Sequence, residues 1–455
     1  MSSFNDDFLW SASTSAYQVE GASDKYGKGL SIQDIKIPLP GTPDFKICSD
    51  HYHKYKEDIK LFKELGLKAY RFSIAWTRIF PNGFGEINKE GVEFYSDLID
   101  ELIKNEIEPI VTMYHFDLPY ELEKNGGWEN RQVVDYFVDF AKVLFEKYGT
   151  RVKYWLTINE QNMMIIHSDL IDGTKGNEKL YQKNHHMLLA QAKVMDLCHK
   201  MLPNAKIGPA PNIAVVYPET SSPEDNLAAQ YANVLRNWLY LDAAVFGRYN
   251  HMATKYIKDK GYIFNVSEED INILKNAKPD FIGINYYNTY CVSHSKSTND
   301  ISKLDTVLTE KGYYNAVANK YLEFTEFGWQ IDPLGFEITL NEVYSRYSLP
   351  ILITENGLGA YDKLEEDGTI HDDYRVDYLR KHINSMKRAI QNGVEVIGYS
   401  PWSAIDLIST HQGFEKRYGF IYVNRNNDDI LDLSRIKKDS FYWYKKVIET
   451  NGEKL

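Results

Sequence analysis

The stretch YKEDIKLFKELGLKAYRFS, residues 55–73, carries the pattern from which we infer the fold. Its first half repeats apolar side chains at spacings of four, three and three, which predicts an amphipathic helix. These apolar residues are Tyr55, Ile59, Phe62 and Leu65. Its second half, residues 68–73, is rich in aromatic side chains and predicts a buried strand. Helical sequence that alternates with buried strands is typical of α/β folds with a parallel sheet.

The same alternation extends over the whole chain. A second helical face is marked by Val133, Phe137, Phe140 and Leu144. The strand candidates are residues 8–12, 68–73, 110–114, 154–158, 206–209, 281–284, 351–354 and 396–399. No linker, internal repeat or series of antiparallel hairpins divides them. We therefore predict one α/β domain over residues 1–455, folded as a (β/α)8 TIM barrel.

Two segments exceed what a minimal barrel needs. About thirty mostly polar residues follow Tyr290, and residues 363–373 form an acidic loop. Long insertions in such barrels usually lie at the C-terminal face, where they wall a pocket. Each segment taken alone is equally compatible with an uninvolved surface excursion.

The charge balance excludes several classes of partner. The 455 residues include 52 basic and 64 acidic side chains, which gives a formal net charge of −12. Such a chain has no electrostatic attraction to nucleic acid or to an anionic membrane. Residues 1–7 lack the features of a signal peptide, no apolar run of about 18 residues is present, and the three cysteines form no CxxC pair. We expect a cytoplasmic protein with neither of these partners.

The sequence gives no support for a metal or a cofactor. The histidine pairs His51/His53 and His185/His186 lack a third ligand at a suitable spacing, and no Gly-x-Gly-x-x-Gly motif follows a strand. We therefore expect neither group. The oligomeric state is left open, a homo-oligomer included.

Polar and aromatic residues gather where the predicted strands end, which is where barrel enzymes carry their catalytic groups. These residues are Gln18, Glu20, Arg71, His115, Asn159, Glu160, Asn285, Tyr287, Glu355 and Trp402. Any single one could cap a loop or form a satisfied buried hydrogen bond. The whole set is hard to explain by structure alone and indicates one functional site at the barrel mouth.

Two glutamates in this set indicate the chemistry. Glu160 and Glu355 end strands four and seven, which face each other across an eight-stranded barrel. We expect Arg71 to hold Glu355 ionised, while an uncharged, amide-rich neighbourhood around Asn159 lets Glu160 keep a proton above the reference pKa of about 4.3. One proton donor and one carboxylate aimed at the same point are what glycoside hydrolysis requires.

Longer stretches around these residues resemble glycoside hydrolase family 1 over essentially the whole chain. They are FLW at 8–10, AYQVEG at 16–21, YRFSIAWTRIFP at 70–81, TINE at 157–160 and ITENG at 353–357. The resemblance implies a TIM barrel in which Glu160 is the acid/base and Glu355 the nucleophile. It implies sugar contacts from Gln18, His115, Asn159 and Trp402. It further implies that Arg71, Asn285 and Tyr287 surround and orient the nucleophile.

The segment that follows Trp402 is similar to the branch of the family that acts on 6-phosphorylated sugars. Plain β-glucosidases of the family have Glu-Trp where this chain has Ser409 and Thr410, and many have proline where it has Gln161. A carboxylate about 4 Å from a phosphate costs about 4 kcal/mol per charge pair at an effective dielectric of 20. Ser409, Lys416 and Tyr418 match the family's phosphate-binding set, although a Lys-Arg pair is also a common surface dipeptide.

The resemblance implies retaining hydrolysis of a phosphorylated β-glucoside to glucose 6-phosphate and an aglycone. Thr410, in place of the tryptophan of phospho-β-galactosidases, favours the gluco configuration. A 6-phospho-β-galactosidase, an unphosphorylated β-glucosidase and a non-catalytic sugar-phosphate sensor remain alternatives. We expect Trp329 to form a platform on the aglycone side.

Overall fold

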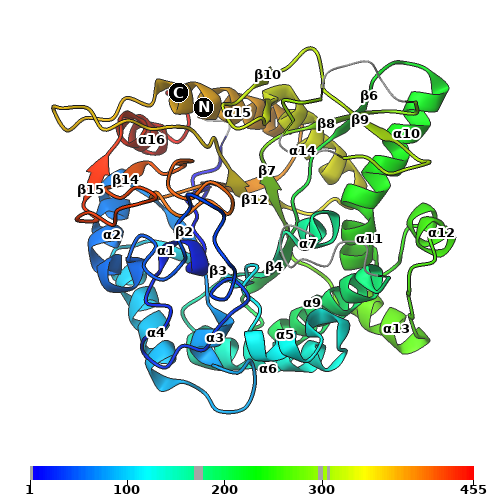
Figure 1. The fold of residues 1–455 in the computed structure, drawn as a ribbon, viewed down its shortest axis with the longest axis horizontal. Helices are drawn as coiled ribbons and strands as arrows, with labels where there is room; N and C mark the ends of the chain where they lie inside the picture. Colours follow the sequence, from blue (N-terminus) through cyan, green and yellow to red (C-terminus); the bar gives the residue numbers. More distant parts are fainter. Residues whose placement is uncertain (1–3, 169–177, 296–300, 305–307) are drawn as a thin grey trace.

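Eight parallel strands close into a barrel at the centre of the molecule (Figure 1). The computed structural model describes residues 4–168, 178–295, 301–304 and 308–455. The barrel strands are β1 (Leu9–Trp10), β2 (Ala69–Ser73), β3 (Glu108–Tyr114), β4 (Tyr154–Asn159), β5 (Lys206–Ala210), β7 (Ile282–Tyr286), β12 (Ile351–Asn356) and β13 (Val396–Pro401). The predicted (β/α)8 barrel is confirmed, because a strand is present in each of the eight predicted segments.

The strands form two sheets that are joined at both seams. The orders are β2-β3-β4-β5 and β1-β13-β12-β7. At one seam the Arg71 backbone N–H donates to the carbonyl of Ala12 (3.0 Å), and at the other the Asn285 N–H donates to the carbonyl of Pro211 (3.1 Å). Although β1 is only two residues long, pairing continues beyond it, since the Ser13 N–H donates to the carbonyl of Pro401 (3.0 Å).

Helices surround the barrel (Figure 1). The outer helices are α2 (His51–Leu65), α4 (Lys89–Lys104), α6 (Gln132–Tyr148), α9 (Leu180–Met201), α10 (Pro223–Asn233), η2 (Val234–Trp238), α11 (Leu239–Phe246), α12 (His251–Asp259), α13 (Glu268–Asn276), α14 (Pro333–Tyr347), α15 (Asp373–Gln391) and α16 (Asp439–Glu449). Short helical turns lie in the loops: α1 (Ala16–Val19), α3 (Trp76–Ile79), α5 (Tyr120–Lys124), η1 (Gly127–Glu129) and α7 (Gln161–Ile166).

The stretch 55–73 folds as its pattern predicts. The four apolar residues of its helical half are all buried on the inner face of α2. Gly66 ends that helix in a left-handed conformation (φ 89°), with its N–H on the carbonyl of Phe62 (3.1 Å). The chain then enters β2, whose five residues are all buried.

The barrel interior changes from apolar to polar toward the ends of the strands. A compact apolar layer fills the lower part and consists of Ala69, Ile110, Leu156, Ala210, Phe281 and Leu352. Two residues further along β2, β3 and β12 stand Arg71, Thr112 and Thr354, all of them fully buried. Because side chains two apart on a strand point to the same face, this polar layer lies directly above the apolar one.

Small additional sheets lie in the connections. They are formed by β6 (Val216–Pro218) with β8 (Tyr290–Ser293) and β9 (Asn315–Val317), by β10 (Glu323–Phe324) with β11 (Gln330–Ile331), and by β14 (Ile421–Val423) with β15 (Arg435–Lys437). Of the roughly thirty residues after Tyr290, residues 296–300 and 305–307 lie outside the described part, and none of the described ones lines the pocket discussed below. Trp329, which does line it, follows this segment. The other long segment, 363–373, contributes none of the described residues that line this pocket.

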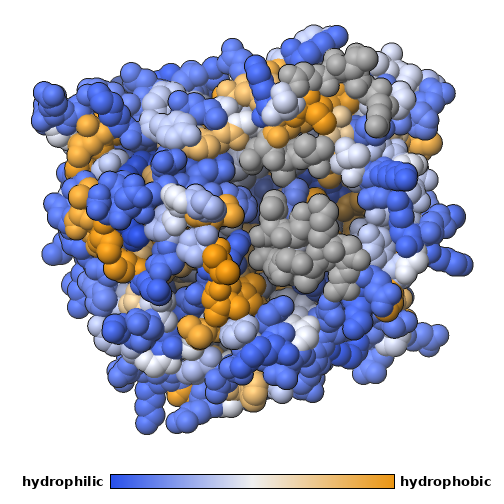
Figure 2. Space-filling view, in the orientation of Figure 1, coloured by the Kyte–Doolittle hydropathy of each residue, from blue (hydrophilic) through white to orange (hydrophobic). Residues whose placement is uncertain are grey.

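The hydrophilic surface agrees with the many charged side chains of the sequence, 52 basic and 64 acidic. Figure 2 shows a largely hydrophilic face with small separate apolar areas, hollowed near its centre over the barrel strands. Within the described part of the chain, no helix combines the length and apolar character that a membrane span needs.

Candidate active site

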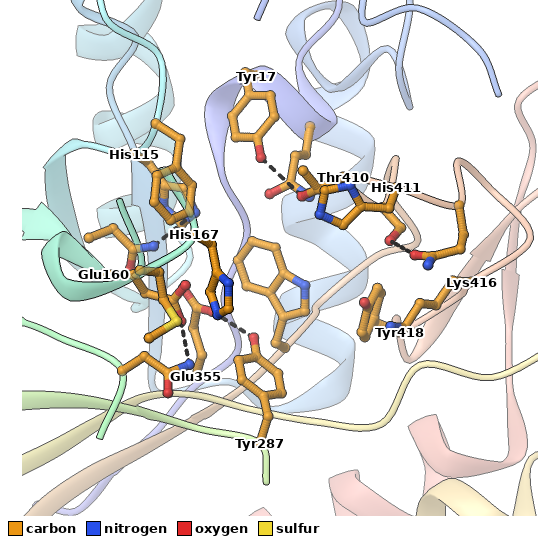
Figure 3. A pocket seen from close by; sticks show the side chains of 18 of the residues that line it. Tyr17, His115, Glu160, His167, Tyr287, Glu355, Thr410, His411, Lys416 and Tyr418 are labelled. Atoms are coloured by element: carbon orange, nitrogen blue, oxygen red, sulfur yellow. Dashed lines mark hydrogen bonds between the residues drawn. The ribbon is translucent and has the colours of Figure 1, made fainter. Parts of the chain in front are cut away.

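One pocket contains both glutamates and most of the residues expected at the barrel mouth (Figure 3). Glu160 and Glu355 lie on one side of it, and Lys416 and Tyr418 lie on the opposite side. The other expected residues that line it are Gln18, His115, Asn159, Tyr287, Trp329, Trp402 and Ser409. Strands far apart in the sequence therefore converge on one cavity.

Glu355 is held by two short hydrogen bonds at the end of β12. Arg71 donates from Nη1 to Oε1 (2.5 Å), and the Tyr287 hydroxyl donates to Oε2 (2.5 Å). Both partners are buried, as is Glu355 itself. Each carboxylate oxygen thus has a fixed partner, which aims the group into the pocket next to a guanidinium charge.

Glu160 occupies the turn between β4 and α7, in a left-handed conformation (φ 45°) that is uncommon for a residue with a side chain. Its Oε1 accepts hydrogen bonds from Asn212 Nδ2 (2.9 Å) and Asn285 Nδ2 (3.0 Å). Burial, followed by the charge of Glu355, raises the pKa of Glu160 to about 7.

The raised pKa agrees with the expectation, but its cause differs. The amide donors of Asn212 and Asn285 bond to the carboxylate and therefore lower the pKa of Glu160. Burial and the neighbouring carboxylate raise it more strongly. The amide-rich neighbourhood thus limits the shift instead of producing it.

Asn159 and Asn285 link the two carboxyl groups. Asn159 Oδ1 accepts from Arg71 Nη2 (2.6 Å) and from Asn285 Nδ2 (3.0 Å). Asn285 lies beside Glu355 in the register of β7 and β12, as expected, but its side chain is hydrogen-bonded to Asn159, Glu160 and Thr354. The Thr354 hydroxyl donates to its Oδ1 (2.5 Å), which leaves its nitrogen to face Glu160.

His115 and Trp402 form one wall of the pocket, with their rings stacked at an 18° angle and 5.8 Å between centroids. Asn159 Nδ2 lies 3.1 Å from His115 Nε2. An amide nitrogen only donates, so this imidazole nitrogen accepts and the ring is neutral. Burial, with a smaller effect from Arg71, places the pKa of His115 well below its usual value, which agrees with this assignment.

Gln18 lies beside the same wall with a fixed side-chain amide. It accepts from the Ser15 hydroxyl (2.7 Å) and donates to the carbonyl of Ile408 (2.8 Å). Glu20, the other polar residue predicted near the end of strand one, is not among the described residues that line the pocket. It is buried instead against Arg78 (2.7 Å) and the hydroxyl of Tyr95 (2.7 Å).

Lys416 is buried at the far end of the pocket with only 2% of its surface exposed. Its ammonium group lies 3.8 Å from the ring centroid of Trp329, and Tyr418 is buried beside it. A Cβ at Gly359 would come within 2.6 Å of the Lys416 side chain, so the loop after β12 packs tightly against the lysine. A surface dipeptide is therefore excluded for Lys416 and Arg417.

A buried ionic network fixes the segment that carries these residues. Asp406 accepts from Arg417 Nη1 (2.8 Å), from Lys438 Nζ (2.7 Å) and from the backbone N–H of Gly419 (2.9 Å). Ser409 follows three residues later, and its hydroxyl donates to Gln412 Oε1 (3.2 Å). Ser409 and the pair Lys416 and Tyr418, which form the expected phosphate site, thus lie on one segment that the hydrogen bonds of Asp406 hold in place.

Trp329 differs from its expected position. It was predicted to stand on the aglycone side, but its ring lies against Lys416 and 5.0 Å from that of Tyr287. Trp329 therefore belongs to the lysine end of the pocket.

Several lining residues were missed by the sequence analysis. They include Tyr17, Gln33, Lys36, Met163, His167, Asn212, Asn288 and Tyr290. Asn212 follows β5 by two residues, so the rule applied to the other strand ends would have found it. Among the described residues, no group of three His, Cys, Asp or Glu side chains is arranged to hold a metal ion.

Comparison with known proteins places the chain in a family. The model of glycosyl hydrolase family 1 matches residues 1–453. The chain belongs to glycosyl hydrolase family 1. This hydrolase is 43% identical to an aryl-phospho-β-D-glucosidase of Bacillus subtilis (strain 168), over all of this chain and 98% of the relative. It is 39% identical to a 6-phospho-β-galactosidase of Clostridium acetobutylicum, over 98% of this chain and 97% of the relative.

A solved structure also matches the chain, in its backbone as well as in its sequence. The hydrolase matches a β-glucosidase from Thermotoga maritima in complex with glucoimidazole with a TM-score of 0.90 and 35% identity, covering 99% of both chains. Relatives named as a phospho-β-glucosidase, a phospho-β-galactosidase and a β-glucosidase therefore each match essentially the whole chain. The overall match does not distinguish among these three names.

Proposed function

We propose that this family 1 hydrolase is a 6-phospho-β-glucosidase that acts with retention of configuration. The observation that carries the proposal is the distribution of charge in its pocket. Of the described lining residues, only Glu160 and Glu355 are carboxylates, and both lie on the reaction side. Lys416, Tyr418 and Ser409 supply one cation and two hydroxyl donors at the other end. Such a set suits a phosphate group.

The hydrogen-bond geometry supports a double displacement. Glu160, protonated near neutral pH, donates its proton to the glycosidic oxygen while Glu355 attacks the anomeric carbon, which forms a glycosyl ester and releases the aglycone. Arg71 and Tyr287 orient the attacking carboxylate. Their surroundings thus keep Glu160 protonated as the acid and Glu355 ionised as the nucleophile.

The same contacts prepare the second step. The charge of Glu355 is one of the two causes that raise the pKa of Glu160. That charge disappears when Glu355 becomes an ester, so the pKa of Glu160 falls and the group becomes a base. It then takes a proton from water, the water oxygen attacks the anomeric carbon, and glucose 6-phosphate leaves with Glu355 restored.

The proposal predicts a clear order among three chromogenic substrates. We expect kcat/KM for 4-nitrophenyl β-glucoside 6-phosphate to exceed that for the neutral glucoside by about three orders of magnitude, because the phosphate gains a buried cation and hydroxyl donors. The galacto 6-phosphate should lie between them. Steady-state rates with all three measure this order.

The outcomes of that comparison separate the alternatives. A neutral glucoside that is hydrolysed faster than its 6-phosphate would contradict the proposal. A faster galacto 6-phosphate would favour a 6-phospho-β-galactosidase, and no turnover of any of the three would favour a sugar-phosphate sensor. A substrate carrying a phosphate charge does not cross a bilayer unaided, so we expect the enzyme to act in the cytoplasm.

The raised pKa of Glu160 predicts the pH dependence. The carboxyl must be protonated in the free enzyme, so kcat/KM should decrease as the pH rises through about 7, with a tenfold loss for each further unit. The substrate phosphate also titrates, near pH 6, and affects the acidic side of the profile. The alkaline decrease should disappear in Glu160→Gln, measured with an activated aryl leaving group. A decrease that persists unchanged in that variant would assign it to another group.

A further inference from the structure

Arg236 is a buried cation whose partners among the described residues are all uncharged. It lies on η2, a π-helical turn between α10 and α11, and is 1% exposed. Its guanidinium donates to Asn212 O (2.9 Å), Asn212 Oδ1 (2.6 Å) and Asn237 Oδ1 (2.7 Å), and it lies over the ring of Tyr290 (4.4 Å). None of these described partners is a carboxylate. A buried charge is unfavourable unless it is paired, and π-helical turns are frequent at functional sites.

Asn212, which receives two of these bonds, has a single possible amide orientation. A guanidinium only donates, so the atom facing Arg236 is the amide oxygen. The amide nitrogen then faces Glu160 and donates to Oε1 (2.9 Å). Asn162 holds the backbone of the same residue, since its Oδ1 accepts from the Asn212 N–H (3.0 Å) and its Nδ2 donates to the Asn212 carbonyl (2.6 Å).

We propose that Arg236 is a positioning residue that acts through Asn212 to keep a hydrogen-bond donor directed at the acid/base carboxylate of Glu160. This proposal rests on the acid/base role assigned above. The amide bridges a cation and a carboxyl group, so the bridge is strongest when Glu160 is ionised. It thereby opposes the effect of burial and allows Glu160 to act as a base in the second step as well as an acid in the first.

Other charged and titratable groups face Glu160. Substitution of Arg236 or Asn212 leaves all of them in place. Glu355 and Arg71 act on it through their charges. The hydroxyls of Tyr287 and Tyr17 are also electrostatically coupled to it, and His167 lines the same pocket. The second donor to Glu160, Asn285, is held by Thr354, and its side-chain hydrogen bonds within the described part of the chain do not include Arg236.

The test compares Asn212→Ala, Arg236→Met and the double variant by the pH dependence of kcat/KM, using whichever chromogenic glycoside the parent enzyme hydrolyses fastest. We expect the alkaline decrease to move to higher pH by about one unit in each single variant, because a donor to the ionised form is lost. The double variant should show no further shift, since Arg236 acts only through Asn212. With a dinitrophenyl aglycone, which needs no protonation, kcat should fall about tenfold and a burst of released phenol should appear.

Arg346→Met is the matched control. Arg346 is another arginine next to η2, since it lies over the ring of Trp238, but it pairs with Asp242 away from the pocket. It should leave the alkaline decrease in place. Should Arg236→Met fail to fold, Arg236→Lys, which keeps the charge but not the planar fork, must give a smaller shift in the same direction. An unmoved pH profile in Asn212→Ala, or additive shifts in the double variant, would overturn the proposal. A parent enzyme without any alkaline decrease would instead disprove the acid/base assignment.

Discussion

Replacing Glu355 by glutamine should reduce kcat by a factor on the order of 10⁴ to 10⁶, while the protein stays folded and still binds its substrate. The side chain keeps its size, its amide oxygen can still accept from Arg71, and its amide nitrogen can donate to the Tyr287 hydroxyl. It loses the negative charge and the nucleophilic oxygen, so no glycosyl ester forms. Steady-state rates with the aryl 6-phosphate measure the loss. Calorimetric binding of the same substrate to the variant shows that the site itself is intact.

Glu20→Gln is a closely matched control for this variant. Glu20 is also a buried glutamate held by one arginine and one tyrosine, Arg78 and Tyr95. Breaking this buried pair should lower the free energy of unfolding by about 3–5 kcal/mol. Because Glu20 does not line the pocket, the change in kcat should stay within about tenfold. Equal losses of activity in the two variants would show that Glu355 stabilises the fold and is not the nucleophile.

External azide gives an independent readout of the same step. In Glu355→Ala the side chain is absent, and azide can enter the space and attack the anomeric carbon in its place. The product should be an α-glycosyl azide, because a single displacement inverts the β configuration. A β-glycosyl azide as the product would argue against a nucleophile at this position. So would a folded variant whose activity azide does not restore.

The comparison of Glu20 with Glu355 also shows what the sequence could predict. Both residues stand near the end of a predicted strand, and both have an arginine and a tyrosine partner. Periodicity located the strands, and with them the end of the barrel at which polar groups collect. Which of these groups faces the cavity depends on loop paths that short-range pattern does not encode. Only the family resemblance separated the two glutamates.

The causes of the electrostatic effects were less accessible to sequence reasoning. The pKa of Glu160 is raised mainly by burial, which depends on packing by several elements and not on neighbours in the chain. Asn212 and Arg236 are distant in sequence from Glu160; only in the folded barrel does Asn212 contact Glu160, and Arg236 contact Asn212. Gln161, the residue that differs from plain β-glucosidases, donates to Asn184 Oδ1 (2.6 Å) behind the site and is not among the described lining residues.

Ser409→Glu should abolish the preference for the phosphorylated substrate. A carboxylate about 4 Å from the phosphate is worth about 4 kcal/mol of repulsion per charge pair at an effective dielectric of 20. We therefore expect kcat/KM for the 6-phosphate to fall about 10³-fold. The neutral glucoside gains a hydrogen-bond acceptor for its hydroxyls and should be hydrolysed as fast as before or faster. The ratio of the two kcat/KM values measures the effect and is insensitive to the amount of folded enzyme.

Ser409→Gln separates charge from size in this experiment, because glutamine has the shape of glutamate without its charge. It should lower the rate with the phosphorylated substrate far less than glutamate does. Lys416→Met approaches the same site from the other side: it removes the buried cation while its thioether can still pack on Trp329. If charge repulsion and charge attraction at one phosphate explain the preference, Ser409→Glu and Lys416→Met must both act on the phosphorylated substrate and spare the neutral one. Equal losses with both substrates would mean that this end of the pocket supports the fold, and the phosphate would have to bind elsewhere.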